Sequence, residues 1–425
     1  MSTMRSLIVP LLVMVTAIGA CVGDTRATAD VIGLPTLFDS TGDTVRARVV
    51  GTVDSADIRT LVAEVRIEGE VGDSILFGNA GDLTLNPSGV VAVNDYSSTQ
   101  LLLFASDGAL IGRMGGTGSG PGEYQDVNGL VALADSTWAV YDANTSRVSF
   151  FAPDGGFLDS WVAPSTKIIG NGMLVTDTSR ALRLMQFVLP PSGDFMAAEA
   201  GLARVLAGGA GLADTSIAPT LGVKVPEYRA QIGDKRSSTL ATSQLSPQEV
   251  ASWHPDGHWV LMEGGGYRVL FAKREGRPIV VTRDAPSIPV DEDERAYHEE
   301  RILWLMRRLD PSWTWQGAPI PNVRAPASAM FIARDGSVWV QVALPAERIP
   351  EAERDEQRAD ASPVRRWRER FAYEVFDRTG TFLGRVAIPP RTTLHDAAGD
   401  IVWGIQVNED DVPTIVKFRV TPALR

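Results

Sequence analysis

The chain has 425 residues, of which 44% are hydrophobic and 22% are charged, and this composition is that of a globular protein. Its net charge of −12 argues against nucleic-acid binding, because phosphate contacts need clustered Lys and Arg. The sequence contains one cysteine, so no intramolecular disulfide can form and the fold must be stabilised by packing.

The first 20 residues have the features of a signal peptide. Arg5 supplies a positive charge, and the apolar stretch Leu7 to Ala20 is too short to span a bilayer comfortably. The stretch leads into "IGAC", Ile18 to Cys21, which resembles the lipobox of bacterial lipoproteins. The resemblance implies a lipid anchor on Cys21, which is durable because it carries two or three acyl chains. The alternative is an ordinary cleaved signal followed by a chance cysteine.

The lipobox resemblance also implies a location and a layout. Val22 follows the cysteine, and by similarity to the sorting rule of enteric bacteria the absence of Asp there favours the outer membrane. We therefore expect a protein of the bacterial cell envelope that faces the periplasm or the exterior. The expected layout is a signal peptide over residues 1–20, a tether over 21–44 and a folded body over 45–425.

A repeat is visible within the predicted folded body. The segments Val91–Gly112 and Trp138–Asp159 align without gaps at an offset of 47 residues. A third copy, Tyr373–Arg385, keeps Phe376 and Gly380 at the same separation. Self-similarity with a fixed period of this length indicates a propeller or a solenoid.

Short apolar strands that run into a tight turn recur along the chain. Asp-Gly and Ser-Gly dipeptides between alternating apolar runs are strong signals for β-hairpins. The six turns are centred on Gly89, Ser136, Gly193, Gly257, Gly336 and Gly399. If each turn joins the first two strands of a sheet, the chain contains six sheets of one kind. Short strands at such spacing favour an all-β fold over helical repeats.

The two gapless copies resemble the NHL repeat family over roughly residues 82–160. The matching features are a glycine-rich connector, an inner strand with its turn, a strand ending in Asp, and a strand ending in Phe and Asp-Gly. They read "GSGPGEY", "GLVALADS", "TWAVYD" and "RVSFFAPDG" here. Proteins of this family form six-bladed β-propellers, so the resemblance implies that fold. It is weak over residues 165–245 and partial afterwards.

A propeller must close its ring, because an open last blade would expose a strand edge. The C-terminal unit supplies three strands, around Thr392–His395, Ile401–Val407 and Thr414–Val420. The N-terminal segment 61–69 alternates apolar and charged residues, which suits a half-buried edge strand. We expect this segment to supply the fourth strand, and segment 38–50 is the alternative.

The segment Gly115–Tyr124, "GGTGSGPGEY", lies between the first two predicted blades. Glycine permits positive φ and Pro121 fixes a bend, so the composition fits a loop that crosses from one blade to the next. A phosphate loop would need a Lys–Ser/Thr pair that opens a helix, and here Glu123 and Tyr124 follow instead. The segment is therefore interpreted as a crossing loop.

The two faces of the predicted propeller differ. The tight turns open on one face, whereas the long connections, residues 200–245, 286–325 and 343–370, open on the other. Loops displayed by a rigid scaffold usually carry the binding site. Insertion 286–325 contains a helix with a capping box at Asp291 and Glu294, which either forms a lid or packs on the rim.

The insertion 343–370 is expected to be a second helical insertion on the same face. Its arginines around Trp367 would either hold an anionic ligand or form a solvated charged face. The fold class expected from the whole sequence is therefore an all-β, six-bladed β-propeller, closed by an N-terminal strand and carrying helical insertions on one face.

The candidate binding residues are polar, charged or aromatic residues expected on the loop-rich face. They are Asp95, Tyr96, Glu123, Tyr124, Asp142, Arg147, Glu263, Trp304, Trp313 and Trp367. The tryptophans would stack on a sugar or a peptide, or else belong to the core. The four carboxylates would offer oxygen ligands to Ca²⁺, or else cap their own loops, and the latter is favoured. No metal ligand or other cofactor is assigned.

Two functions fit this arrangement. The first is binding of a protein, peptide or glycan partner on the loop-rich face of a lipid-anchored propeller. The second is a metal-dependent lyase or lactonase reaction near the central channel. The sequence contains no His-His-carboxylate spacing for zinc and no Gly-x-Ser-x-Gly elbow. Binding is therefore favoured, and no catalytic residue is assigned.

Overall fold

The structure is a computed structural model. It describes residues 34–71, 74–75, 77–163, 174–178, 181–188, 199–232, 237–273, 275–354 and 362–424. The predicted signal peptide, the predicted lipidation site Cys21 and the first part of the predicted tether lie outside the described residues. Within the described ranges, no helix is long and apolar enough to cross a membrane.

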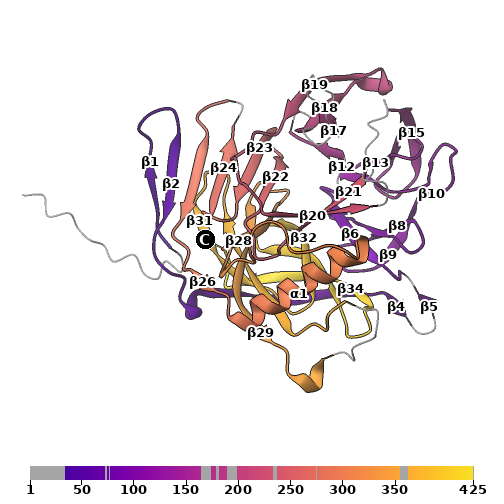
Figure 1. Ribbon diagram of the computed structural model, residues 1–425. Coiled ribbons are helices and arrows are strands. Elements are labelled where there is room, and N and C mark those ends of the chain that lie inside the picture. The colour runs from indigo at the N-terminus through magenta and orange to yellow at the C-terminus, as the bar shows by residue number, and fades with distance from the viewer. Residues whose placement is uncertain are drawn as a thin grey trace, which may run out of the picture. The chain divides into compact units, whose positions relative to one another are not determined.

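Six sheets follow one plan, in which four strands lie side by side in antiparallel order (Figure 1). The first sheet contains β6 (Ala80–Leu85), β7 (Val91–Asp95), β8 (Gln100–Phe104) and β9 (Leu110–Met114). The second contains β12 (Gly129–Ala132), β13 (Trp138–Asp142), β14 (Arg147–Phe151) and β15 (Phe157–Val162). The third contains β16 (Leu174–Thr176), β17 (Leu182–Val188), β18 (Glu199–Val205) and β19 (Leu212–Ile217).

The remaining sheets repeat the plan with longer connections. The fourth contains β22 (Glu249–His254), β23 (His258–Glu263), β24 (Arg268–Ala272) and β25 (Ile279–Arg283). The fifth contains β28 (Ala327–Ile332), β29 (Val338–Arg348), β30 (Trp367–Phe376) and β31 (Phe382–Ala387). The sixth contains β32 (Thr392–Ala398), β33 (Ile401–Val407), β34 (Pro413–Thr421) and, from the N-terminal part of the chain, β3 (Ile58–Glu68).

Short elements lie between these sheets. They are β1 (Thr36–Asp39), β2 (Val45–Val49), β4 (Glu70–Val71), β5 (Ser74–Ile75), β10 (Gly116–Thr117), β11 (Glu123–Tyr124), β20 (Glu227–Ile232), β21 (Ser237–Thr242), β26 (Ile288–Pro289) and β27 (Val323–Arg324). The described part of the chain has one α-helix, α1 (Glu292–Leu309), and short 3₁₀ turns at Ser55–Asp57, Ala207–Gly209 and Glu351–Glu353.

The packing of the sheets on one another is cyclic. Each of the six cores lies between two sheets that are consecutive in the chain, except that one joins the sixth sheet to the first. Residues of two sheets share each core, such as Leu103 and Trp138, Tyr141 and Leu174, Leu202 and Trp259, Val260 and Val338, Trp339 and Val402, and Trp403 and Leu83. Six sheets that pack in this closed order form a ring, which is the architecture of a six-bladed β-propeller.

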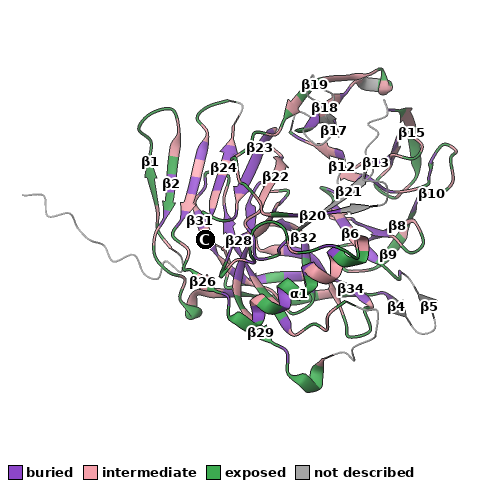
Figure 2. Cartoon of the chain, in the orientation of Figure 1, coloured by how far each residue is buried: buried purple, intermediate pink, exposed green. Residues whose placement is uncertain are grey.

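Burial follows position within the sheets. All five residues of β7 and all five of β13 are buried, because a neighbouring sheet covers each face of these second strands. The strand β23 is likewise buried along most of its length, whereas β1, at the margin of its sheet, is largely exposed (Figure 2). The second strands consequently read as apolar runs without alternation.

The strand β3 links the fifth and sixth sheets. Ile58 and Arg59 pair in parallel with β31, and Thr60 to Glu68 then pair antiparallel with β34. The segment favoured from the sequence, 61–69, therefore lies beside the last strand of the chain. The alternative segment forms a hairpin, because β1 pairs with β2, and β2 pairs in parallel with β25 to extend the fourth sheet. Within the described residues the first strand begins at Thr36, in the segment expected to be part of the tether.

Five of the six predicted turns join the first and second strands of a sheet. Gly89, Gly257, Gly336 and Gly399 take positive φ there, and Ser136 takes a φ of 69° at the equivalent position. The sixth assignment is wrong. Gly193 follows β17, so its segment connects the second and third strands of the third sheet and not the first two. Gly193 itself lies outside the described residues.

The glycine-rich segment 115–124 crosses from the first sheet to the second. Gly115 and Gly122 have φ values of 70° and 77°, and a Cβ on Gly115 would lie 2.8 Å from the carbonyl oxygen of Gly122. The Glu123 carboxylate accepts a hydrogen bond from the backbone N–H of Gly120 at 2.8 Å. The loop is thus folded by its own residues, as expected for a crossing loop.

The expected helical insertion over 343–370 is wrong where the structure describes it. The strands β29 and β30 extend beyond their sheet as a two-stranded arm, and Glu347 lies opposite Arg368 in it. Charged residues that alternate along a ribbon can mimic the spacing of a solvated helix. The only helical geometry described within 343–370 is the short turn Glu351–Glu353.

Candidate functional site

Three insertions of the propeller meet on its loop-rich face. The β20–β21 hairpin belongs to the connection between the third and fourth sheets, and α1 to the connection between the fourth and fifth. The third insertion is the β29–β30 arm. The helix lies against β20, as Figure 1 shows, and β26 beside it contacts β29. We call these three insertions together the platform.

The helix α1 begins where the sequence predicts. The Asp291 side chain accepts a hydrogen bond from the backbone N–H of Glu294 at 2.7 Å, which is half of the predicted capping box. Acidic residues occupy the first turn, whereas Arg307 and Arg308 occupy the last, and both distributions favour the helix dipole. The helix ends at Leu309, before Pro311.

An apolar core holds α1 on the hairpin. Ile302 and Met306 are buried against Tyr228 and Trp313. The indole N–H of Trp313 donates to the backbone carbonyl of Arg229 on β20 at 2.8 Å. The predicted binding residue Trp313 therefore belongs to the core, since it is 3% exposed. This packing matches the interpretation of α1 as a rim helix.

A buried ion cluster holds α1 on the arm. The Arg324 guanidinium, on β27, donates to Glu294 of α1 and to Glu369 of β30. His298, one turn after Glu294, places its Nε2 atom 3.5 Å from Oε1 of Glu369. The Arg324 guanidinium thus lies between two carboxylates, and its charge offsets part of the cost of burying them.

The environment shifts the pKa values of the two carboxylates of this cluster in opposite directions. Burial raises the pKa of Glu294 above its ordinary value, and the charge of Arg324 opposes this only in part. For Glu369 burial also acts upward, but His298 and Arg324 together lower its pKa overall. The ionised form of Glu369 is therefore the better stabilised of the two.

The same cluster has the residue types of a metal site. Glu294, His298 and Glu369 each offer a ligand atom, and these atoms lie within 4.8 Å of one another. However, Arg324 already pairs with both carboxylates, so a divalent cation would lie against a fixed positive charge. The residues fit an ion cluster better than a metal centre. Within the described residues no other group of three His, Cys, Asp or Glu side chains is this close.

Arginines and aromatic rings alternate along one side of α1. The guanidinium of Arg301 lies 5.8 Å and that of Arg366 5.2 Å from the ring centre of Tyr297. Arg308 lies 5.4 Å from the ring centre of Trp304, the second predicted tryptophan. We call these five residues the arginine–aromatic ladder. They lie at distances typical of cation–π contacts.

The third predicted tryptophan, Trp367, lies at the start of β30. It is 8% exposed, and the guanidinium of Arg348 lies 5.9 Å from its ring centre. Its position is thus structural. The predicted arginine cluster around it is dispersed into pairs, because Arg366 pairs with Glu300 whereas Arg368 pairs with Glu347 and Glu353.

The predicted carboxylates do not come together, because each one caps its own loop. Asp95 accepts from the backbone N–H of Asn79 at 2.9 Å, and also bonds Ser97 and Ser98. Burial alone would raise the pKa of Asp95, but these hydrogen bonds lower it overall. Asp142 bonds Thr145 in the same manner, and Glu263 accepts from Gly266 N–H.

The predicted binding residue Tyr124 lies in the core. It is 1% exposed, its hydroxyl donates to the Met114 carbonyl at 2.8 Å and accepts from Leu101 N–H at 3.1 Å. Burial raises its pKa to about 12. Tyr124 therefore anchors the crossing loop in the core between the first two sheets. Tyr96 lies against Gly81 in its own sheet, and Arg147 is half-buried at the start of β14.

The histidines are distributed between two sites apart from His298. His254 and His258 stack with ring centres 4.4 Å apart in the fourth sheet, and both are buried. His395, on the inner strand β32, places Nδ1 3.1 Å from Oδ1 of Asp82 on the inner strand β6. This pair joins the sixth sheet to the first.

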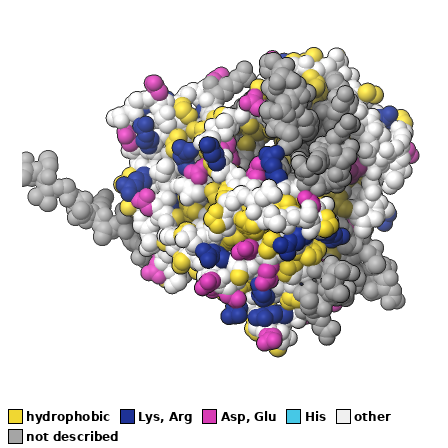
Figure 3. All heavy atoms as spheres, viewed as in Figure 1, with side chains coloured by type: hydrophobic (Ala, Val, Ile, Leu, Met, Phe, Trp, Pro, Cys, Tyr) yellow, Lys and Arg dark blue, Asp and Glu magenta, His cyan; other side chains and the backbone are white. Residues whose placement is uncertain are grey.

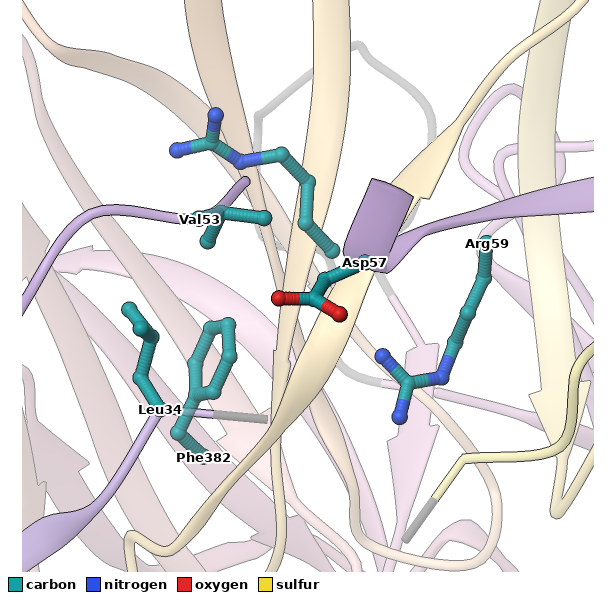
Figure 4. A pocket seen from close by; sticks show the side chains of 6 residues that line it. Leu34, Val53, Asp57, Arg59 and Phe382 are labelled. Atoms are coloured by element: carbon teal, nitrogen blue, oxygen red, sulfur yellow. The ribbon is translucent and has the colours of Figure 1, made fainter. Parts of the chain in front are cut away.

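A small cleft lies at the N-terminal hairpin. It is lined by Leu34, Val53, Asp57, Arg59, Phe382 and Arg385. Figure 4 shows the side chains of Leu34 and Phe382 side by side and Asp57 between them and Arg59. The cleft has room for about one water molecule, so it is a packing defect and not a ligand site.

Fold and platform together define the class of protein: a six-bladed β-propeller with a built platform on one face. No protein-family model matches the sequence, and no curated protein does. Solved structures similar to it include a member of the DUF4221 family from Bacteroides vulgatus, with 9% identity, 85% coverage of this chain and 98% of that chain, and a TM-score of 0.43.

Two enzymes are among the other similar structures. A virginiamycin B lyase from Staphylococcus aureus has 9% identity, 84% coverage of this chain and 99% of that chain, and a TM-score of 0.40. A gluconolactonase from Xanthomonas campestris has 11% identity, 85% and 99% coverage, and a TM-score of 0.39. The assignment of the fold rests on the cyclic packing order of the six sheets.

Proposed function

We propose that this protein is a lipid-anchored propeller of the bacterial envelope, closed by β3, which binds a protein, peptide or glycan partner on its platform. The observation that carries the proposal is the fastening of three separate insertions into one body. An apolar core joins α1 to the hairpin, and the Arg324 cluster joins α1 to the arm. Closing the ring of sheets does not require these contacts between insertions. Because the contacts fix the insertions in place, they preorganise the surface, and a preorganised surface favours binding.

The lipid anchor rests on "IGAC" at residues 18–21 and on the apolar stretch before it. The outer membrane is favoured because Val22 follows the cysteine. Cys21→Ser should abolish acylation and processing, and mass spectrometry of the purified protein measures both. If the serine variant is still processed and still fractionates with membranes, the anchor proposal is wrong.

Because the chain has a single cysteine, the platform can be tested by labelling a second cysteine introduced there. Acylation would block the only natural thiol, so a cysteine introduced elsewhere becomes uniquely reactive. We would introduce Glu299→Cys on the exposed side of α1, and Ser106→Cys in a tight turn as the matched control. Each full-length variant is then modified with a bulky maleimide polymer and used to recover partners from solubilised envelopes.

Modification at residue 299 should reduce recovery of a specific partner, whereas modification at residue 106 should not. Equal recovery after both modifications would contradict binding through the platform. The unmodified natural chain serves as a further control, because maleimide labelling of it would reveal a free Cys21 thiol.

A further inference from the structure

The sequence of α1 contains more apolar surface than the core beneath it uses. Residues 302–306 read "ILWLM", and five consecutive residues of a helix cannot all face one side. Ile302 and Met306 are buried in the core, and the half-buried Leu303 and Leu305 pack against it, whereas the half-buried Trp304 is not part of it. Figure 3 shows hydrophobic side chains gathered over α1 with charged side chains of both signs at their margin. Surface of this kind, rimmed by polar groups, marks interaction sites.

Two of the three arginines of the ladder lack acidic partners among the described residues. Arg301 and Arg308 are exposed, and each contacts an aromatic ring but forms no ion pair with another described residue. In contrast, the third arginine of the ladder, the half-buried Arg366, pairs with Glu300, and the exposed Arg348 of the arm pairs with Asp293.

Stacking on an aromatic ring also fixes the orientation of these arginine side chains before a ligand binds. A guanidinium over an aromatic face loses side-chain freedom before any ligand arrives, while its N–H groups in the ring plane remain able to donate. Tyr297 is buried, so the accessible part of the ladder runs from Arg301 to Arg308, about 10 Å along the helix axis at 1.5 Å per residue. The strip can therefore meet several groups of a partner at once.

We infer that the arginine–aromatic ladder of α1 is a docking surface for an acidic protein segment that presents carboxylates around apolar side chains. Charge complementarity selects the acidic partner. Trp, Tyr and Arg are also the residue types that dominate binding energy at protein interfaces, which favours a polypeptide over a sugar. This inference rests on the proposed platform function and names the chemistry of its partner.

The test uses a fluorescein-labelled peptide of Glu, Leu and Gly, and the same peptide with Gln in place of Glu. Fluorescence anisotropy with the full-length protein in detergent should show binding of the Glu peptide and at least about ten-fold weaker binding of the Gln peptide. Arg301→Glu with Arg308→Glu should weaken binding of the Glu peptide by about ten-fold or more. Trp304→Ala should weaken it too, whereas Trp304→Phe should retain most of the affinity.

The matched control is Arg46→Glu with Arg113→Glu, which gives the same overall charge but changes exposed arginines far from α1 in the sequence. It should bind like the natural chain. Equal binding by both charge-reversed variants, absence of binding by the natural chain, or displacement only by a sulfated oligosaccharide would overturn the inference. Partner recovery blocked at residue 299 but unaffected by Arg301→Glu with Arg308→Glu would overturn it while leaving the platform function intact.

Discussion

The Glu374 carboxylate, fully buried on β30, accepts a hydrogen bond from Nε of Arg283 on β25 at 2.9 Å. The contact joins the fifth sheet to the fourth. Arg385 and the hydroxyl of Tyr267 donate to the same carboxylate, both at 2.6 Å. Burial, followed by the negative charge of Glu374, raises the pKa of Tyr267 well above its ordinary value. The Glu374 carboxylate thus binds three donors inside the otherwise apolar seam between the fourth and fifth sheets.

Glu374→Gln should therefore be strongly destabilising. It leaves two guanidinium groups in the interior without a counter-charge, which costs about 3–5 kcal/mol in comparable buried pairs. Urea unfolding measures the loss. Asp284→Asn is the matched control, because it breaks the exposed pair with Arg48 and should cost less than about 1 kcal/mol. Similar losses for the two variants would show that Glu374 does not stabilise the seam.

The propeller itself was predictable because its signals are local. Asp95 and Asp142 recur at the ends of second strands, where each caps the loop that follows within three residues. Such hairpin units repeat in the sequence as they repeat in space. The Ser-Gly dipeptide at residues 192–193 misleads for the same reason: such a dipeptide predicts a turn, but it does not say which two strands the turn would connect.

The platform was not predictable in the same way. Its ion cluster joins Glu294, Arg324 and Glu369, which lie far apart in the sequence, and no periodic pattern links them. The Trp313 side chain illustrates the same difficulty, since its burial depends on a hairpin some 80 residues earlier. The alternating charges of the arm fitted a helix and a ribbon equally well, and only pairing across the arm distinguishes the two.

The stacked pair His254 and His258 should make the protein sensitive to acid. Burial, and for His258 also the neighbouring His254, lowers the pKa of both groups, to about 4 for His258. The unfolded chain, with a His pKa of about 6.5, binds more protons than the folded chain below that pH. Stability is therefore complete above pH about 6.5 and falls as the pH approaches 4. For His258 alone the loss at pH 5 is about 2 kcal/mol.

His258→Phe keeps a stacked ring and removes the titration. Its melting temperature should fall less than that of the natural chain between pH 7 and pH 5, as calorimetry would show. Parallel pH profiles for the two proteins would contradict the assignment. The exposed variant Arg113→Gln serves as a control and should follow the natural profile.

Asp396 should give stability the opposite pH dependence, so that its contribution is lost as the pH rises. Burial raises its pKa to about 6, although Arg334 opposes the shift. Below pH about 3.8 both states bind the proton. As the pH rises through 6, the folded state must release a proton that it holds more tightly, so the stability contribution is lost. Asp396→Asn should thus gain up to about 3 kcal/mol relative to the natural chain between pH 4 and pH 7.5. A constant difference across this range, in urea unfolding, would contradict the prediction.

The Arg324 cluster should determine how firmly α1 is held. Arg324→Met leaves Glu294 and Glu369 buried without their cation, and local opening of the helix should become about 100-fold more frequent, equivalent to about 3 kcal/mol. Hydrogen exchange measures this as lost protection in α1 while β13 stays protected. Adding Glu294→Gln and Glu369→Gln removes the unpaired charges and should restore part of the protection. Arg366→Met removes the pair with half-exposed Glu300 and the contact with the Tyr297 ring, but leaves no buried carboxylate without its cation, and should cost much less protection. Unchanged protection of α1 in the Arg324 variant would mean that the apolar core alone holds the helix.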